Sequence, residues 1–214
     1  MGERIVDLTR IVEPTGPEAP RRFVVRHRPA IAEPPGMVRP AGEWYIMSEV
    51  ELMTHVGTHI EVPYHCLEQG RDVAQVPVEQ LVGWAVVLDL SEAESACGVT
   101  LPQVQGAAAR AGGVRQGDIV LGRMGATGSF STAALQWLVD QGMKLMGVDS
   151  GGVEGPDPEH RNAAHLVLFR ADIPLIENLV HLDQLTRSRV KLFALPVPAR
   201  GLDAVPLRVI AIED

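Results

Sequence analysis

The feature that most constrains the fold of this chain is the alternation of apolar runs with helical segments through its middle. Apolar runs of strand length are expected at residues 84–90, 118–121, 144–148 and 173–176. Helices are expected at 100–111, at 132–141 with Ser131 as N-cap, and from Asp157-Pro158 onward, the last carrying His165. Further strands are expected at residues 5–8, 44–52, 191–195 and 207–212. Helices between central strands, with more strands at both ends, predict an α/β fold with a mixed sheet.

The length of 214 residues is that of one domain, so residues 1–214 are expected to form a single unit. A Pro/Arg-rich arm at about 14–40 interrupts the pattern, because it holds seven of the sixteen prolines and several arginines. We expect this arm to lack regular structure. It is either a solvated surface loop or a lid that closes over a site or a neighbouring subunit.

Composition and charge limit the classes of partner that the protein is expected to bind. The content of 46% hydrophobic and 21% charged residues is ordinary for a globular protein. A net charge of −8 argues against binding of nucleic acid, which usually requires a basic surface. No apolar run is long enough to cross a bilayer, and residues 1–7 lack the apolar core of a signal peptide, so we expect a cytoplasmic protein without a membrane partner. The expected partners are a small molecule and further copies of the chain.

Residues 55–65 combine ligand side chains with a strand pattern. His55, His59 and Glu61 fall on odd positions, whereas the even positions from 56 to 62 are all β-branched. An extended chain therefore places the three on one face, and His65 joins them if the strand continues past Pro63. The spacing of His55 and His59 also suits a zinc-binding helix, but Gly57, Pro63 and the β-branched residues weaken a helix. Imidazole and carboxylate groups on one face suit zinc, manganese or iron(II). The alternative is a row of partly exposed polar residues on an edge strand.

The same stretch resembles the signature HxGTHxDxPxH of the cyclase family of metal-dependent hydrolases, which includes bacterial kynurenine formamidase and isatin hydrolase. Here it reads His55-x-Gly57-Thr58-His59-x-Glu61-x-Pro63-x-His65. Residues 5–9, His165 with residues 176–179, and the ending at 195–208 are similar to other parts of the family. The resemblance thus runs over nearly the whole chain.

The resemblance implies a swivelling β/α/β fold, a homo-oligomer (dimer or tetramer) and a site for zinc or manganese. In that site His55, His59 and Glu61 would bind one ion, and Glu61 would bridge to a second ion held by His165 and Glu177. His65 would be the catalytic acid–base group. Glu61 stands where the family usually has Asp, and the longer side chain leaves open whether one or two ions bind per chain.

The function expected from these features is hydrolysis of a small formamide, cyclic amide or lactone by a metal-activated water. Two alternatives stay open. The first is a family member that binds a metal or ligand without turnover, because Glu61 replaces the usual Asp. His59 and Glu61 with a distant histidine also match the ligand set of a facial-triad iron(II) oxygenase, although such sites commonly lie in all-β barrels.

Overall fold

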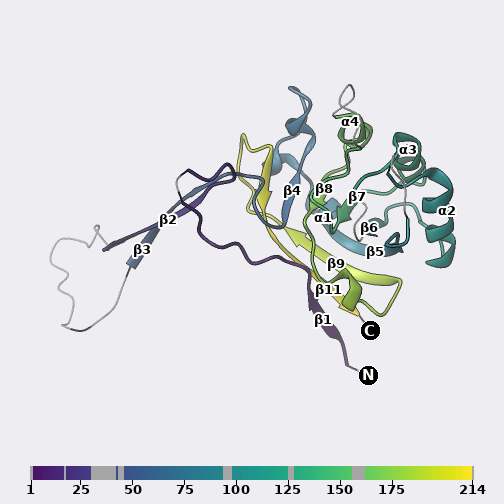
Figure 1. Ribbon diagram of the computed structural model, residues 1–214, viewed down its shortest axis with the longest axis horizontal. Coiled ribbons are helices and arrows are strands. Elements are labelled where there is room, and N and C mark those ends of the chain that lie inside the picture. The colour runs from purple at the N-terminus through teal and green to yellow at the C-terminus, as the bar shows by residue number, and fades with distance from the viewer. Residues whose placement is uncertain are drawn as a thin grey trace.

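The computed structural model describes residues 2–16, 18–29, 42, 46–93, 98–124, 128–155 and 162–213. Within these residues a nine-stranded mixed sheet has the order β1-β11-β9-β5-β6-β7-β8-β4-β10, and β2 and β3 form a separate two-stranded sheet (Figure 1). The pairs β5–β6, β6–β7 and β7–β8 are parallel, and the remaining pairs are antiparallel. The predicted α/β class with a mixed sheet is confirmed.

The strands are β1 (Arg4–Asp7), β2 (Phe23–Pro29), β3 (Ile46–Leu52), β4 (His59–Glu61), β5 (Val82–Asp89), β6 (Ile119–Arg123), β7 (Leu145–Val148), β8 (Leu175–Glu177), β9 (Arg189–Leu195), β10 (Ala204–Pro206) and β11 (Arg208–Glu213). The α-helices are α1 (Val78–Leu81), α2 (Leu101–Arg110), α3 (Thr132–Asp140) and α4 (Ala163–Arg170), with 3-10 turns η1 (Pro63–His65), η2 (Val73–Gln75) and η4 (Leu182–Gln184). No described helix has the length and apolar character needed to span a membrane.

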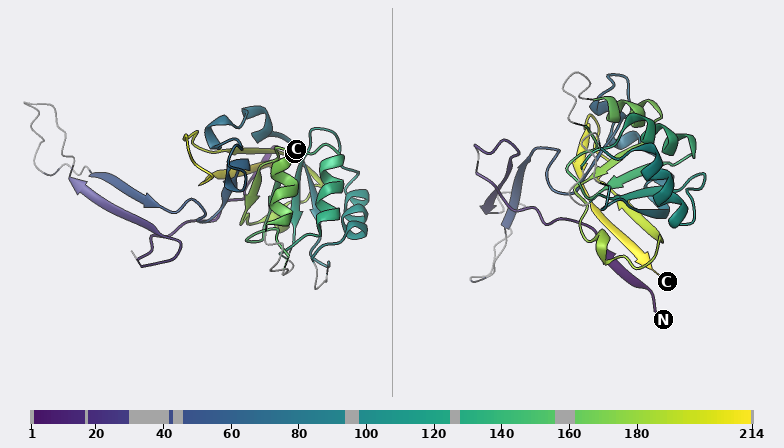
Figure 2. Two further views of the ribbon diagram at one scale, coloured as in Figure 1. Left: turned by 90° about the horizontal axis from the view of Figure 1, so that it is seen from above. Right: turned by 45° about the vertical axis from the view of Figure 1, so that its right-hand side comes forward.

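Helices α2, α3 and α4 cover one face of the sheet above the parallel strands (Figures 1 and 2). Side chains such as Val86, Leu135 and Leu168 form the core between these layers. A second core lies on the opposite face. It includes Ile60 of β4, Leu145 of β7 and residues of β6, β9 and β11. Burial on both faces explains why β6 and β7 are continuous apolar runs rather than alternating ones. Apolar side chains are thereby removed from water on both sides of the parallel strands.

The helices do not extend over the antiparallel side of the sheet. The register pairs Phe193 with both Val82 and Ile210, and it pairs Ile212 with Ile5, so these side chains continue the face that the helices cover elsewhere. Ile5 is 65% exposed, and Trp84 and Leu195 on the same face are also largely exposed. Within the described part of the chain the result is an uncovered apolar face, which is unusual for the outer surface of a sheet.

The β2–β3 hairpin projects away from the large sheet (Figures 1 and 2). Its register places Phe23 beside Leu52 and Val25 beside Val50 on one side, and Arg26 beside Glu49 on the other. Such alternation is the pattern of a ribbon with one apolar and one charged face. The expectation that residues 14–40 lack regular structure is therefore wrong for 23–29, where alternating side chains outweigh the high proline content. Residues 30–41 lie outside the described residues.

Both helices expected between residues 100 and 141 are confirmed, and Ser131 caps α3 through the backbone N–H of Ala134. The helix carrying His165 is also present, but it begins at Ala163 after Asn162. Its expected opening at Asp157-Pro158 lies outside the described residues, as does Trp44 of the strand expected from residue 44. The short strand β10 was not expected from the sequence.

Candidate metal centre

The ligand-rich stretch forms a much shorter strand than the sequence pattern suggests. Only residues 59–61 belong to β4, so the expected strand is wrong for His55, and the strand does not continue past Pro63 to His65. Gly57 has a φ of 63°, and a Cβ at this position would collide with the side chain of Val12, so a glycine is needed for the turn before β4. On the other side Pro63 begins the 3-10 turn that carries His65. Turns at both ends bend the stretch around the centre.

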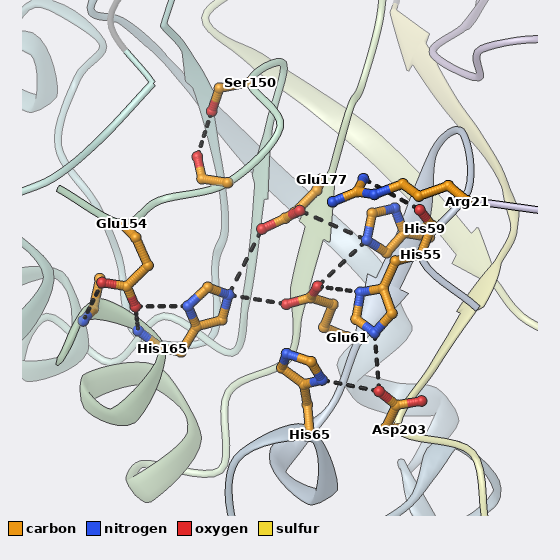
Figure 3. A network of polar contacts seen from close by, with 12 residues as sticks. Arg21, His55, His59, Glu61, His65, Ser150, Glu154, His165, Glu177 and Asp203 are labelled. Carbon is orange, nitrogen blue, oxygen red and sulfur yellow. Dashed lines mark hydrogen bonds and ion pairs between the residues drawn. The ribbon is translucent and has the colours of Figure 1, made fainter. Parts of the chain in front are cut away.

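Neighbouring strands bring the other side chains to β4. His59 lies directly opposite Glu177 of β8, and Glu61 lies opposite Ala204 of β10. His165 approaches from the first turn of α4, where it is largely buried. Six predicted residues therefore surround one centre (Figure 3): His55, His59, Glu61, His65, His165 and Glu177.

Glu61 occupies the middle of this arrangement. Its Oε1 lies 2.7 Å from His55 Nδ1 and 3.3 Å from His59 Nε2, whereas its Oε2 lies 3.0 Å from His165 Nε2. Glu177 is placed in a similar way, with Oε2 3.6 Å from His59 Nε2 and Oε1 3.7 Å from His165 Nε2. Both carboxylates thus face histidines on two sides.

Each of the four histidines has a polar contact outside the centre. His59 Nδ1 donates to the carbonyl of Gly57 at 3.0 Å, and His165 Nδ1 lies 2.7 Å from Glu154 Oε1. His55 Nε2 and His65 Nδ1 both lie 2.9 Å from Asp203 Oδ2. An outer acceptor that fixes the ring and leaves the other nitrogen free to bind is typical of histidines at metal sites.

The centre holds a large negative charge in a buried place. The exposed fractions are 0% for His59, 3% for Glu61 and 4% for Glu177. Burial opposes ionisation of Glu61, but hydrogen bonds from His165, His55 and His59 outweigh it and hold its pKa well below the usual value. Burial likewise works to lower the pKa of His165, yet contacts with Glu154, Glu177 and Glu61 raise it to about 12. In the protein without a metal, the carboxylates therefore hold a proton on His165, which indicates that the centre favours a cation.

The donor set fits a divalent metal. Among the described residues, two groups have ligand atoms that all lie within 4.8 Å of one another, namely His55, Glu61 and His65, and His59, Glu61 and Glu177. They share Glu61, and both combine imidazole nitrogen with carboxylate oxygen, which zinc and manganese accept. These two groups divide the residues differently from the family pattern, since His65 joins the first group and His165 lies beside Glu61 and Glu177 without belonging to either.

A cavity of about 1190 Å³ opens onto this centre. The walls include His55, Glu61, His65, Glu154, His165 and Glu177 from the centre, together with Pro20, Arg21, Met53, Asn162 and the glycines at 151, 152 and 155. Small-molecule sites are commonly concave and combine a few polar groups with apolar walls. The cavity therefore gives a substrate direct access to the candidate ligands.

Fold and site together define an α/β protein with a mixed sheet and a histidine–carboxylate centre suited to divalent cations. The model of the Cyclase family matches residues 6–155, and the chain belongs to this family. Kynurenine formamidases from Erythrobacter litoralis and Bordetella petrii are each 30% identical to it; each alignment covers 78% of this chain, and 77% and 80% of those proteins. Among solved structures, isatin hydrolase A from Labrenzia aggregata, bound to benzyl benzoate, has a TM-score of 0.79 at 25% identity, covering 98% of this chain and 93% of that one.

Glu154 and Asp203 were not assigned to the site by the sequence analysis. Glu154 lies in a glycine-rich turn and also accepts hydrogen bonds from the backbone N–H groups of Ala164 and His165, so it caps α4. Asp203 immediately precedes β10, and its backbone carbonyl accepts a hydrogen bond from Val62. Glu154 lies 11 residues from His165, and Asp203 lies 138 residues from His65, so these contacts appear only when the chain is folded.

Proposed function

We propose that this protein is a metal-dependent hydrolase that cleaves an amide C–N bond in a small molecule. The observation that carries the proposal is the set of four histidines, each held by an outer acceptor, around Glu61 and Glu177. The proposed metal ligands are His55, His59, Glu61, His165 and Glu177, and the proposed acid–base group is His65. The relatives named kynurenine formamidase and isatin hydrolase support formamides and cyclic amides as substrates, with lactones as related candidates.

We propose two zinc or manganese ions per chain. The support is that the two oxygens of Glu61 face different histidines, with His55 and His59 on one side and His165 on the other. A bound ion of this type polarises a carbonyl oxygen and lowers the pKa of water to about 7. The extra methylene of Glu61 relative to Asp is compatible with this role, because its carboxylate reaches histidines on both sides.

The residues of the chain would then supply proton transfer and orientation. Asp203 holds Nδ1 of His65, and Figure 3 shows the other ring nitrogen turned towards the side of Glu61 and His165. In this orientation His65 takes a proton from the attacking water and delivers it to the departing nitrogen. Because the side chain of His65 is 31% exposed, the group can also exchange protons with solvent.

The alternatives receive less support. A facial-triad oxygenase needs two histidines and one carboxylate, whereas this centre assembles four histidines and two glutamates on an α/β fold. A protein without turnover has no need for a histidine–aspartate pair beside the ligands, and His65 with Asp203 forms such a pair.

We further propose that the protein is a homo-oligomer. The uncovered apolar face around Phe193 and the apolar side of the β2–β3 hairpin support this proposal, since both leave apolar side chains exposed on an isolated chain. A two-stranded hairpin is also marginally stable unless it packs against something else. A second copy of the chain could cover both the face around Phe193 and the apolar side of the hairpin.

The test of the hydrolase proposal is turnover of a panel of formamides, cyclic amides and lactones by protein reconstituted with zinc or manganese. We expect hydrolysis of at least one formamide or cyclic amide, and a loss of about 100-fold or more in kcat for His65→Ala. The exposed His181→Ala serves as the control. Absence of turnover over the whole panel, or an unchanged rate in His65→Ala, would contradict the proposal.

A further inference from the structure

Arg21 is a charged residue of the cavity wall that the proposed mechanism does not use. It lies just before β2, at the base of the hairpin, and Figure 3 shows its guanidinium reaching the backbone carbonyl of His55. Among the described residues that line the cavity it is the single lysine or arginine, whereas Glu61, Glu154 and Glu177 are acidic. The positive charge of Arg21 is not needed to neutralise these glutamates, because metal ions bound at the centre would do so.

The hydrogen bonding of Arg21 leaves most of its donors available. Its Nη1 donates to the backbone carbonyl of His55 at 3.3 Å, which is a neutral acceptor. Within the described part of the chain Arg21 forms no ion pair. The next two arginines differ, because Arg22 and Arg26 both pair with Glu51. A guanidinium has five N–H donors in a planar fork that matches a carboxylate, so Arg21 can bind one without losing its contact to His55.

The surroundings of Arg21 restrict the shape of such a ligand. Pro20 and Met53 line the same cavity; Pro20 precedes Arg21, and the backbone N–H of Met53 donates to the carbonyl of Arg22 at 2.8 Å. Met53 is 45% exposed. Proline and methionine side chains provide an apolar surface, and a thioether packs well against an aromatic ring. A ligand that contacts this wall and the centre at the same time would therefore have an apolar body, a hydrolysable bond at one end and a negative charge near Arg21.

We propose that Arg21 binds a carboxylate of the substrate, and that the preferred substrates are amides whose apolar or aromatic body carries this carboxylate. The inference rests on the proposed hydrolase function and specifies its substrate class. Arg21 then acts as a specificity residue that lowers the KM of anionic substrates. The competing explanation is that Arg21 only holds the backbone of His55 in place.

Formanilide and its 2-carboxylate, N-formylanthranilate, separate these explanations because they differ by one negative charge. We expect wild-type protein to favour N-formylanthranilate in kcat/KM, and Arg21→Gln to reduce this preference by about 10- to 100-fold, mainly through KM. Arg21→Lys should retain part of the preference, since it keeps the charge but not the fork. The preference of the wild type should also fall at high ionic strength.

Arg26→Gln is the matched control, because it removes the same charge from the same hairpin at an exposed residue outside the cavity. Its ratio of the two kcat/KM values should equal that of the wild type. A purely structural role for Arg21 would lower the turnover of both substrates equally and reduce the metal content of Arg21→Gln. That result, or an unchanged ratio, would overturn the inference.

Calorimetric binding of N-acetylanthranilate and acetanilide to metal-loaded protein gives a second measurement that does not depend on turnover. We expect Arg21→Gln to weaken binding of the anionic compound about tenfold or more and to leave the neutral compound unaffected. Binding that depends on Arg21 without turnover of either formamide would mean that the proposed hydrolysis is wrong while the carboxylate site stands. Turnover without any dependence on Arg21 would mean that the proposed hydrolysis stands while the carboxylate site is wrong.

Discussion

The Oδ2 atom of Asp203 lies 2.9 Å from Nδ1 of His65. The same oxygen is 2.9 Å from Nε2 of His55, so one carboxylate connects the proposed acid–base group with a proposed metal ligand. Hydrogen bonds to His55 and His65 also hold the pKa of Asp203 below its usual value, against the opposing effect of burial. An ionised Asp203 fixes the orientation of both rings.

Replacement of Asp203 by asparagine tests this positioning role. Asp203→Asn keeps the shape of the side chain but removes its charge, so His65 loses a fixed orientation and His55 binds its ion less well. We expect kcat to fall about 10- to 100-fold and the affinity for metal to fall by a similar factor. Steady-state kinetics and metal titration measure the two effects, and Asp183→Asn, at an exposed residue, is the control. Wild-type values for both quantities in Asp203→Asn would show that the contact has no role.

Glu154 combines a structural and a site contact, and substitution should reveal both. Glu154→Ala removes the acceptor for two backbone N–H groups at the start of α4 and the partner of His165 Nδ1. We expect the metal-free protein to lose about 1 kcal/mol in the free energy of unfolding. We also expect the affinity for metal to fall about tenfold or more. Denaturant unfolding with and without zinc separates the two losses. A metal affinity equal to that of the wild type would show that Glu154 only caps the helix.

Asp89 gives a prediction for the dependence of stability on pH. Burial works to raise its pKa, but hydrogen bonds from Arg123 and Ser91 lower it to about 2, from 3.8 in an unfolded chain. The group therefore stabilises the protein fully above pH 3.8 and loses this contribution as the pH falls towards about 2. The stability difference between wild type and Asp89→Asn should be constant at neutral pH and shrink over this acidic interval. A difference that stays constant down to pH 2 would contradict the assignment.

The apolar side of the hairpin makes a prediction about assembly. Val50 faces Val25 on this side and is 56% exposed in the single chain, so Val50→Glu should disfavour packing of the hairpin against a second copy. We expect light scattering to give at least a dimer for the wild type and a lower mass for Val50→Glu at the same concentration. Glu49→Gln, on the charged side of the same strand, should keep the wild-type mass. A monomeric wild type at micromolar concentration would exclude the proposed assembly.

The sequence predicted the fold well where burial dictates the pattern. The runs at β6 and β7 are apolar because both faces of these strands are covered, and this pattern is visible without a structure. Strand β3 was expected, but its partner β2 was missed because the alternating side chains of β2 occur in a segment rich in proline. The three-residue strand β10 is too short to have a pattern of its own, yet it places Asp203 beside the site.

The candidate ligands were predicted for a reason that is only partly correct. The alternation of residues 55–65 suggested one strand face, whereas the structure brings His55 and His65 to the centre through turns at Gly57 and Pro63. The involvement of His165 and Glu177 came from the family resemblance, because no local pattern relates residues so far apart. Glu154 contacts His165, and Asp203 contacts His55 and His65. These contacts join segments that are separate in sequence and exist only in the folded chain.

The most direct test of the account is the metal content of the protein, measured by elemental analysis after purification and reconstitution with zinc or manganese. Glu61→Gln keeps the shape of the central side chain but removes its charge, and Glu68→Gln removes a carboxylate from an exposed residue nearby. We predict two ions per chain in the wild type and in Glu68→Gln, and fewer than one in Glu61→Gln. Absence of bound metal in the wild type, or two ions retained in Glu61→Gln, would contradict the proposal that this centre is the metal site of a hydrolase.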